Sequence, residues 1–105
     1  MHENQKKILS TERFDEFEQN LKDKAARARI QARIGRLMLG NPGSHRRLEK
    51  GVIELKIDVG PGYRVYYVER SMGTIVILLA GGDKSTQDAD IKTAYSMADK
   101  LDEIA

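Results

Sequence analysis

The chain has 105 residues, of which 40% are hydrophobic and 32% charged, with a net charge of +2 at pH 7. This length fits one small domain, so we expect residues 1–105 to fold as a single unit. No apolar run is long enough to span a bilayer, and the start of the chain lacks the hydrophobic core of a signal peptide, so the sequence predicts a cytoplasmic protein. The absence of cysteine excludes disulfides and thiol catalysis, and two histidines without cysteine do not suggest a zinc site. No metal or other cofactor is expected.

The first half of the sequence predicts a short strand and two helices. Residues 6–10 suit an edge strand, and Thr11 is a candidate N-cap for a helix that ends near Leu21. A second helix is predicted over residues 23–39, because apolar side chains recur on one side of it and the sequence GNPG then stops it. Residues 44–50 are expected to form a basic loop.

Positive charge is concentrated between residues 21 and 50, where nine bases accompany two acids. Arg29, Arg33 and Arg36 form a stripe beside the apolar face of the second helix, and Arg46 and Arg47 lie in the loop that follows. A local excess of this size suits a polyanion or an acidic protein partner. It equally suits a solvated helix face, and charge alone leaves both interpretations open.

The second half predicts three strands followed by a helix. Apolar and polar residues alternate in residues 52–59, as is typical of a half-buried strand, and residues 63–70 form the next strand. Residues 74–80 are apolar on both faces, which indicates a strand covered on both sides. The connecting turns are short, so neighbouring strands should be antiparallel. Residues 88–101 show helical spacing, with Ser85 or Thr86 as the cap. The expected fold is α+β, a small antiparallel sheet (β-α-α-β-β-β along the chain) with two N-terminal helices packed on one face and a C-terminal helix.

Polar side chains on the strands are the candidate functional residues. Glu54, Lys56, Arg64 and Tyr66 are expected on an exposed face of the sheet, and Lys84 follows the last strand. One interpretation is an inert face with cross-strand ion pairs that contribute roughly a few tenths of a kcal/mol each. The other is a concave site in which the three cations converge on a phosphate. Spacing alone favours the inert face. Tyr66 is also a candidate for stacking on a base, although such tyrosines more often pack in a core.

A longer pattern resembles a known family. Residues 48–94, with the pattern GVxELKIxxGPGYRVYY…LLxGGDKSTQxxDIxxA, are similar to the C-terminal half of the RelE/ParE superfamily of toxins from type II toxin–antitoxin modules. The likeness is closest to the HigB-like addiction module killer proteins. The ARxRI pattern in the second helix and the GNPG that follows fit the same group, so the resemblance covers nearly the whole chain and implies a RelE-like fold.

The resemblance implies an endoribonuclease that cleaves mRNA in the translating ribosome without a metal. The ribose 2′-hydroxyl attacks the adjacent phosphate, which requires a base, cations for the growing negative charge and an acid for the leaving 5′ oxygen. By position, Lys56 falls where a lysine acts as base or charge stabiliser, and Arg64 matches the phosphate-binding arginine. Lys84 falls near another cation of the site. Arg46 and Arg47 would bind flanking phosphates, as would the basic helix.

Glu54 departs from the RelE pattern, which has a second lysine at this position. A glutamate there would act as a general base or pair with Arg64. If Lys56, Arg64 and Lys84 line one pocket, an enzyme is favoured; if Arg64 pairs only with Glu54, a binding protein is favoured.

The resemblance also implies partners. A cognate antitoxin, of the HigA-like helix-turn-helix kind, would neutralise the toxin, whose targets would be the ribosome and mRNA; no membrane is involved. Two alternatives remain open. One is a non-enzymatic inhibitor of DNA gyrase, as in ParE-type members, and the other is an inactive module member that only binds its antitoxin. A shared fold does not decide among these functions.

Overall fold

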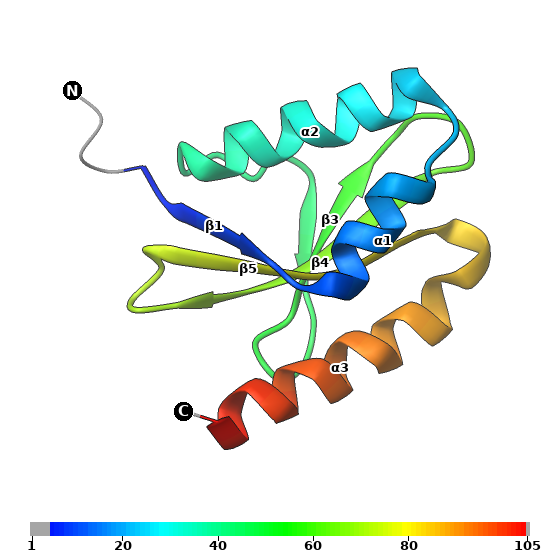
Figure 1. Ribbon diagram of the computed structural model, residues 1–105. Helices are drawn as coiled ribbons and strands as arrows, with labels where there is room; N and C mark the ends of the chain where they lie inside the picture. The colour runs from blue at the N-terminus through cyan, green and yellow to red at the C-terminus, as the bar shows by residue number, and fades with distance from the viewer. Residues whose placement is uncertain (1–4, 105) are drawn as a thin grey trace.

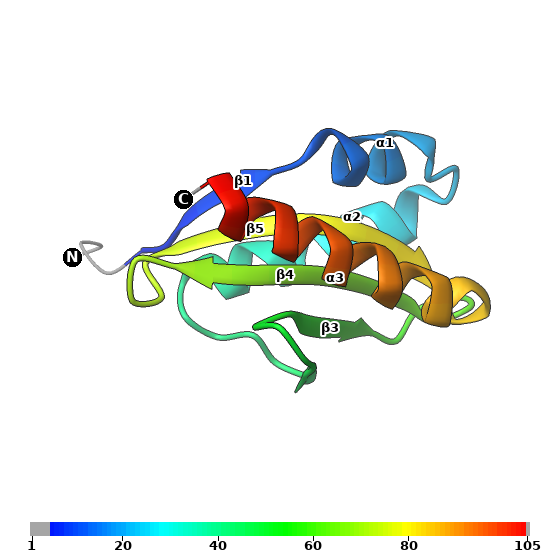
Figure 2. The same cartoon turned by 90° about the horizontal axis from the view of Figure 1, so that it is seen from below.

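The computed structural model describes residues 5–104 as a five-stranded sheet with helices on both faces (Figures 1 and 2). The strands lie in the order β1-β5-β4-β3-β2; β1 is parallel to β5, and all other neighbours are antiparallel. In chain order the elements are β1 (Lys7–Ser10), α1 (Glu12–Asn20), α2 (Lys24–Met38), β2 (His45–Arg47), β3 (Ile53–Ile57), β4 (Tyr63–Arg70), β5 (Ile75–Asp83), the 3-10 turn η1 (Lys84–Thr86) and α3 (Gln87–Ile104). The α+β fold expected from the sequence is confirmed. None of the described helices is both long and apolar enough to cross a membrane.

The two N-terminal helices begin where the sequence predicts. Thr11 Oγ1 accepts the N–H of Phe14 at 3.1 Å, and Asp23 Oδ1 accepts the N–H groups of Ala25 and Ala26 at 3.0 and 3.1 Å. These bonds satisfy donors that the first helical turn leaves without partners. Both helices pack on one face of the sheet, as expected, and their buried side chains join those of the strands. This core consists of Phe14, Ile30, Leu37, Ile53, Leu55, Ile57, Val65, Tyr67, Val76 and Leu78.

The sheet has one strand more than the sequence predicts. Residues 45–47, expected in a loop, form β2 and pair with residues 53–55 of β3. A run of three basic residues shows no alternation of apolar and polar positions, so the pairing leaves no pattern in the sequence. Strand β5 also continues beyond its apolar run, through Gly81 and Gly82 to Asp83.

The second face of the sheet is covered by α3, which crosses it diagonally (Figure 2). Ala94 and Ala98 of α3 are fully buried, and their small side chains allow the helix to approach the strands closely. This contact forms a second core with Val52, Tyr66, Val68, Leu79 and Ala80. The expectation that the polar face of β3 and β4 is open to solvent is therefore wrong at Glu54 and Tyr66, which α3 covers.

Two consecutive glycines allow both layers of helices to close on the end of β5. A Cβ atom on Gly81 would overlap the ring of Phe17 in α1, and a Cβ atom on Gly82 would overlap the carboxylate of Asp90 in α3. Either overlap would force the neighbouring side chain, or the helix that carries it, to move. The glycine pair thus leaves room for α1 and α3 to approach the sheet closely, at the end of the strands that carries the candidate site.

Candidate functional site

Three cations gather at the end of the sheet where β3 ends and β4 begins. Lys56 and Arg64 are directly opposite each other in the β3–β4 register, and Arg64 pairs with Gly82 of β5 on its other side. Lys84 opens η1, just beyond β5. A Cβ atom added to Gly62 would lie 3.6 Å from Arg64 Nη1 and 3.9 Å from Lys84 Cβ, so these two side chains flank the same glycine. The structure therefore brings the three predicted cations to one end of the sheet.

These cations have no acidic partner among residues 5–103. The Arg64 guanidinium donates through Nη1 to the carbonyl of Tyr63 at 3.1 Å, and its buried Nε has no hydrogen-bond partner within the described part of the chain. Like charges directly opposite each other on neighbouring strands are destabilising. An anion between Lys56 and Arg64 would relieve this repulsion and accept the unused N–H groups, and a planar guanidinium suits a phosphate best.

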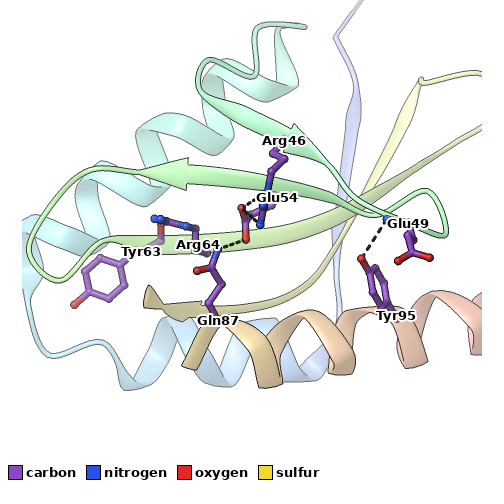
Figure 3. A network of polar contacts seen from close by, with 7 residues as sticks. All are labelled: Arg46, Glu49, Glu54, Tyr63, Arg64, Gln87 and Tyr95. Carbon is purple, nitrogen blue, oxygen red and sulfur yellow. Dashed lines mark hydrogen bonds and ion pairs between the residues drawn. The ribbon is translucent and has the colours of Figure 1, made fainter. Parts of the chain in front are cut away.

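Glu54 lies in a buried polar network on the same face (Figure 3). Its side chain has no exposed surface, and Oε1 lies 3.1 Å from both Nε and Nη2 of Arg46 in β2. Oε2 accepts a hydrogen bond from Nε2 of Gln87 in α3 at 2.8 Å. A second contact between the sheet side and α3 joins the N–H of Glu49 to the hydroxyl oxygen of Tyr95 at 3.2 Å. The Glu54 carboxylate thus links three elements, β2, β3 and α3.

This network corrects one expectation for Glu54 and bears on a second. Its ionic partner is Arg46, and Arg64 points to the neighbouring carbonyl instead. Both carboxylate oxygens are occupied and shielded from solvent, so neither is free to accept a substrate proton in this arrangement, and the role of Glu54 as a general base stays a prediction.

Tyr66 stands opposite Glu54 in β4 and is fully buried beneath α3. Its hydroxyl has no hydrogen-bond partner among the described groups. Burial, with the nearby charge of Glu54, raises the pKa of the Tyr66 phenol above its ordinary value. Because no part of the ring is exposed, the prediction that Tyr66 stacks on RNA is wrong for this structure.

Arg33 was predicted to bind RNA, but its guanidinium is occupied by backbone carbonyls. It donates to Lys56 at 2.6 Å, to Pro42 at 2.8 Å and to Ser44 at 3.0 Å. Burial and the neighbouring charge of Arg36 lower the pKa of Arg33. The side chain therefore fixes the connection between α2 and β2 against β3, and this structural role explains its place on the helix.

The other four predicted RNA-binding arginines do not form one surface. Arg29 and Arg36 are exposed on α2, which packs on the sheet face opposite to the three cations. In β2 the side chains alternate, so that Arg46 pairs with Glu54 on the α3 side while Arg47, opposite Ile53, is on the α2 side. Only Arg46 shares a face with the cations, and Glu54 holds it there.

The residues that the sequence did not single out are on α3. Gln87 reaches Glu54, and Asp90 lies against Gly82 while accepting a hydrogen bond from the Thr86 hydroxyl at 2.6 Å. Both belong to the DKSTQxxDI part of the family-like pattern, which is the only signal that pointed to them. Among residues 5–103, no group of three or more histidine, aspartate or glutamate side chains is arranged to hold a metal ion.

Comparison with solved structures identifies the class of fold. A mutant of the Escherichia coli toxin RelE in the free state aligns with a TM-score of 0.63 and 18% sequence identity, over 92% of this chain and 97% of that chain. The fold is therefore RelE-like. No family model matches the sequence. A Haemophilus influenzae protein described only as uncharacterized is 50% identical over 94 residues, which cover 90% of this chain and 94% of that protein. The chain belongs to the same family as this Haemophilus protein.

Proposed function

We propose that the chain is the toxin of a type II toxin–antitoxin module, of the HigB-like kind, and that it inhibits translation by cleaving mRNA in the ribosome. The observation that supports this most is the group formed by Lys56, Arg64 and Lys84. Three cations without acidic partners among the described residues, at one end of a RelE-like sheet, suit a phosphate whose negative charge grows during the reaction.

In the proposed reaction the ribose 2′-oxygen attacks the adjacent phosphorus, and the bond from phosphorus to the 5′ oxygen breaks. The products are a 2′,3′-cyclic phosphate and a free 5′-hydroxyl. We assign Lys56 to stabilise the 2′ oxygen while its proton passes to water, Arg64 to the phosphate oxygens on which charge builds, and Lys84 to donate a proton to the leaving 5′ oxygen. Each assignment places a cation where the transition state is more negative than the bound RNA, as catalysis requires.

Glu54 has a supporting role in this proposal. Its carboxylate neutralises Arg46 and holds Gln87, so it fixes β2 and the start of α3 beside the cations. The substrate reaches Lys56, Arg64 and Lys84 from the open end of the sheet. It does not contact Glu54 or Tyr66, which lie under α3.

The exposed arginines of α2 supply a second part of the proposal. Arg29 and Arg36 suit the backbone of ribosomal RNA, on the opposite side of the sheet from the mRNA, through contacts that weaken as salt is raised. The proposed antitoxin, a HigA-like helix-turn-helix protein, would cover cationic surface with acidic side chains and so prevent ribosome binding.

The test is to express the chain alone and map RNA ends during growth arrest. We expect cuts in translated mRNA, reduced about 100-fold or more by Arg64→Ala, as for removal of a group that stabilises transition-state charge. Arg13→Ala, which removes an exposed arginine on α1, is the matched control and should cut normally. Arrest with intact mRNA and inhibited DNA supercoiling would contradict the proposal in favour of a gyrase inhibitor. Antitoxin binding without any arrest would favour an inactive module member.

A further inference from the structure

A cavity of about 440 Å³ lies on the face of the sheet that α1 and α2 cover. Its walls come from the end of α1, the turn into α2, the start of β4 and the end of β5. Tyr63 and Arg64 are consecutive in β4, so their side chains point to opposite faces, and Tyr63 packs with the core under α1 and α2. The sheet therefore lies between this cavity and the guanidinium of Arg64. The volume is within the range of sites that hold ligand groups, roughly 300–1,000 Å³.

Two carboxylates in the cavity wall each keep one oxygen that accepts no hydrogen bond from the described residues. Asp23 uses Oδ1 to accept the N–H groups of Ala25 and Ala26 at the start of α2. Asp83 uses Oδ1 to accept the N–H and the hydroxyl of Ser85, which leaves the Oδ2 atom of each aspartate for a ligand. The hydrogen bonds from Ser85 lower the pKa of Asp83, so its carboxylate is ionised near neutral pH. The cavity therefore offers charged acceptors to a group that carries N–H donors.

Phe17 and Tyr63 form the aromatic part of the wall. Their ring centroids lie 6.5 Å apart, with planes inclined by 59°, and both side chains are partly exposed. A cation over the face of such a ring is attracted by the charge distribution of the ring, and a planar guanidinium also stacks on it. The aromatic rings and the carboxylates therefore favour the same kind of group, a planar cation.

The charge around the cavity is opposite in sign to the net charge of the chain. Helix α1, whose last turn lines the cavity, carries four acidic residues and one basic residue, whereas the chain as a whole has a net charge of +2. In the cavity wall itself, Asp23 and Asp83 outnumber Lys22. A negative potential of this kind attracts a basic partner and repels the phosphates of a nucleic acid.

A smaller hollow of about 260 Å³ continues the cavity along α1. Phe17 and Asn20 line both hollows, and Arg13 and Glu16 line only the smaller one. The two hollows together have room for the residues that flank an inserted side chain. They therefore suit an extended peptide segment better than a single small molecule.

We propose that this cavity binds an arginine side chain from an extended basic segment of a protein partner. The guanidinium donates paired N–H groups to the Oδ2 side of Asp23 or Asp83 and lies against the ring of Phe17 or Tyr63. Lysine carries the same charge but lacks the planar fork of donors, so it fits the cavity less well. The inference goes beyond the proposed function and does not rest on it, because none of these residues belongs to the group of three cations.

The experiment follows the ¹H–¹⁵N NMR spectrum of the full chain during titration with short peptides. An acetylated and amidated Gly-Gly-Arg-Gly-Gly peptide should shift the amides of Asn20, Gly82 and Thr86, which line the cavity. The same peptide with lysine in place of arginine should bind about tenfold more weakly, since it lacks the paired donors. A citrulline peptide, which keeps the shape of arginine without its charge, should cause no shifts at the same concentrations.

Substitution of the two aspartates tests the acceptors. The variant that combines Asp23→Asn with Asp83→Asn should bind the arginine peptide about tenfold more weakly or less, as expected for loss of a hydrogen bond to a charged group. Asparagine still caps a helix start, and the NMR spectrum itself shows whether the variant is folded. Binding by the unchanged protein should also weaken as salt is raised. Asp99→Asn, on the exposed side of α3, is the matched control and should bind normally.

The outcomes separate this inference from the proposed function. Equal affinity for the arginine and lysine peptides, shifts only at residues outside the cavity, or unchanged binding in the double variant would overturn the inference. So would a ribonucleoside monophosphate that binds at the same amides more tightly than the arginine peptide. Arginine binding at these amides supports the inference even if the expressed chain leaves translated mRNA intact, in which case the proposed function fails alone. Cleavage of mRNA by a chain that does not bind the arginine peptide would overturn the inference alone.

Discussion

Removal of Arg46 tests whether the buried Glu54 carboxylate depends on its ionic partner. Breaking a fully buried pair by removing one member costs about 3–5 kcal/mol, because the remaining charge is left without compensation. Glu54 has no exposed surface, but the Arg46 side chain is 48% exposed, so water can replace part of what it donates. Gln87 also remains bound to Oε2. We therefore expect Arg46→Ala to lower the free energy of unfolding by about 1–3 kcal/mol, the range for a buried acceptor that loses a partner.

Urea unfolding of a double-mutant cycle measures this contribution directly. The cycle combines Arg46→Ala with Glu54→Gln, and the coupling free energy between them should exceed about 1 kcal/mol. The control cycle combines Lys50→Ala with Asp99→Asn, a pair whose side chains are 45% and 53% exposed. Its coupling should be below about 0.5 kcal/mol, as for other exposed pairs. A decrease in the free energy of unfolding below about 0.5 kcal/mol in Arg46→Ala, or equal coupling free energies in both cycles, would show that burial of Glu54 does not strengthen its ion pair with Arg46.

Further predictions concern the close approach of α3 and the buried tyrosines. Gly82→Ala should lower the free energy of unfolding by about 1–3 kcal/mol, because the added Cβ atom overlaps Asp90. Gly35→Ala in α2 places its Cβ atom in open space and should raise the free energy of unfolding by about 0.5–1 kcal/mol. Thermal unfolding of the two variants compares these effects. Burial raises the pKa of Tyr67 to about 12, so the folded phenol keeps its proton after that of the unfolded chain has ionised near pH 10. The contribution of the protonated Tyr67 phenol to the free energy of unfolding is complete below about pH 10 and is lost as the pH rises to about 12. The free energy of unfolding in urea, measured at about pH 8 and at about pH 11, should therefore fall less in Tyr67→Phe than in the unchanged protein. An alkaline fall of the same size in Tyr67→Phe would contradict the assignment.

The helices and four of the five strands were predictable because their signals are local. Thr11 and Asp23 cap the helices that follow them, and the alternation in residues 53–57 defines which side chains share a face of β3. Short turns then fix antiparallel neighbours, so that Lys56 meets Arg64 across the β3–β4 pair. The gathering of cations at one end of the sheet follows from these rules once the register is set.

The surroundings of Glu54 and Tyr66 were not predictable from the same rules. Alternation separates the two faces of a strand but does not say whether water or a helix covers the polar one. Here the covering helix begins 33 residues after Glu54 in the sequence, and Gln87 reaches the carboxylate because α3 packs across the sheet. One signal was available: the apolar run of β5 demands cover on both faces, and α3 was the remaining helix with an apolar stripe.

Glu54 decides whether the proposed site works through a carboxylate or through cations alone. Glu54→Gln keeps the size of the side chain and the contact with Gln87, but it removes both the charge that holds Arg46 and any capacity to take a proton. If Glu54 were the general base, the substitution would lower the cleavage rate by about 100-fold to 10,000-fold. In the arrangement described here its oxygens are already bound, so we expect a loss of no more than about tenfold, within what a small displacement of a supporting group costs. Rates measured on translated mRNA beside Lys56→Met and Arg64→Ala decide between the two. Suppose that Glu54→Gln loses as much cleavage rate as those variants, while its NMR shifts show that α3 still packs on the sheet. The carboxylate would then take part in the reaction. A small loss leaves the reaction to the three cations that Glu54 does not neutralise.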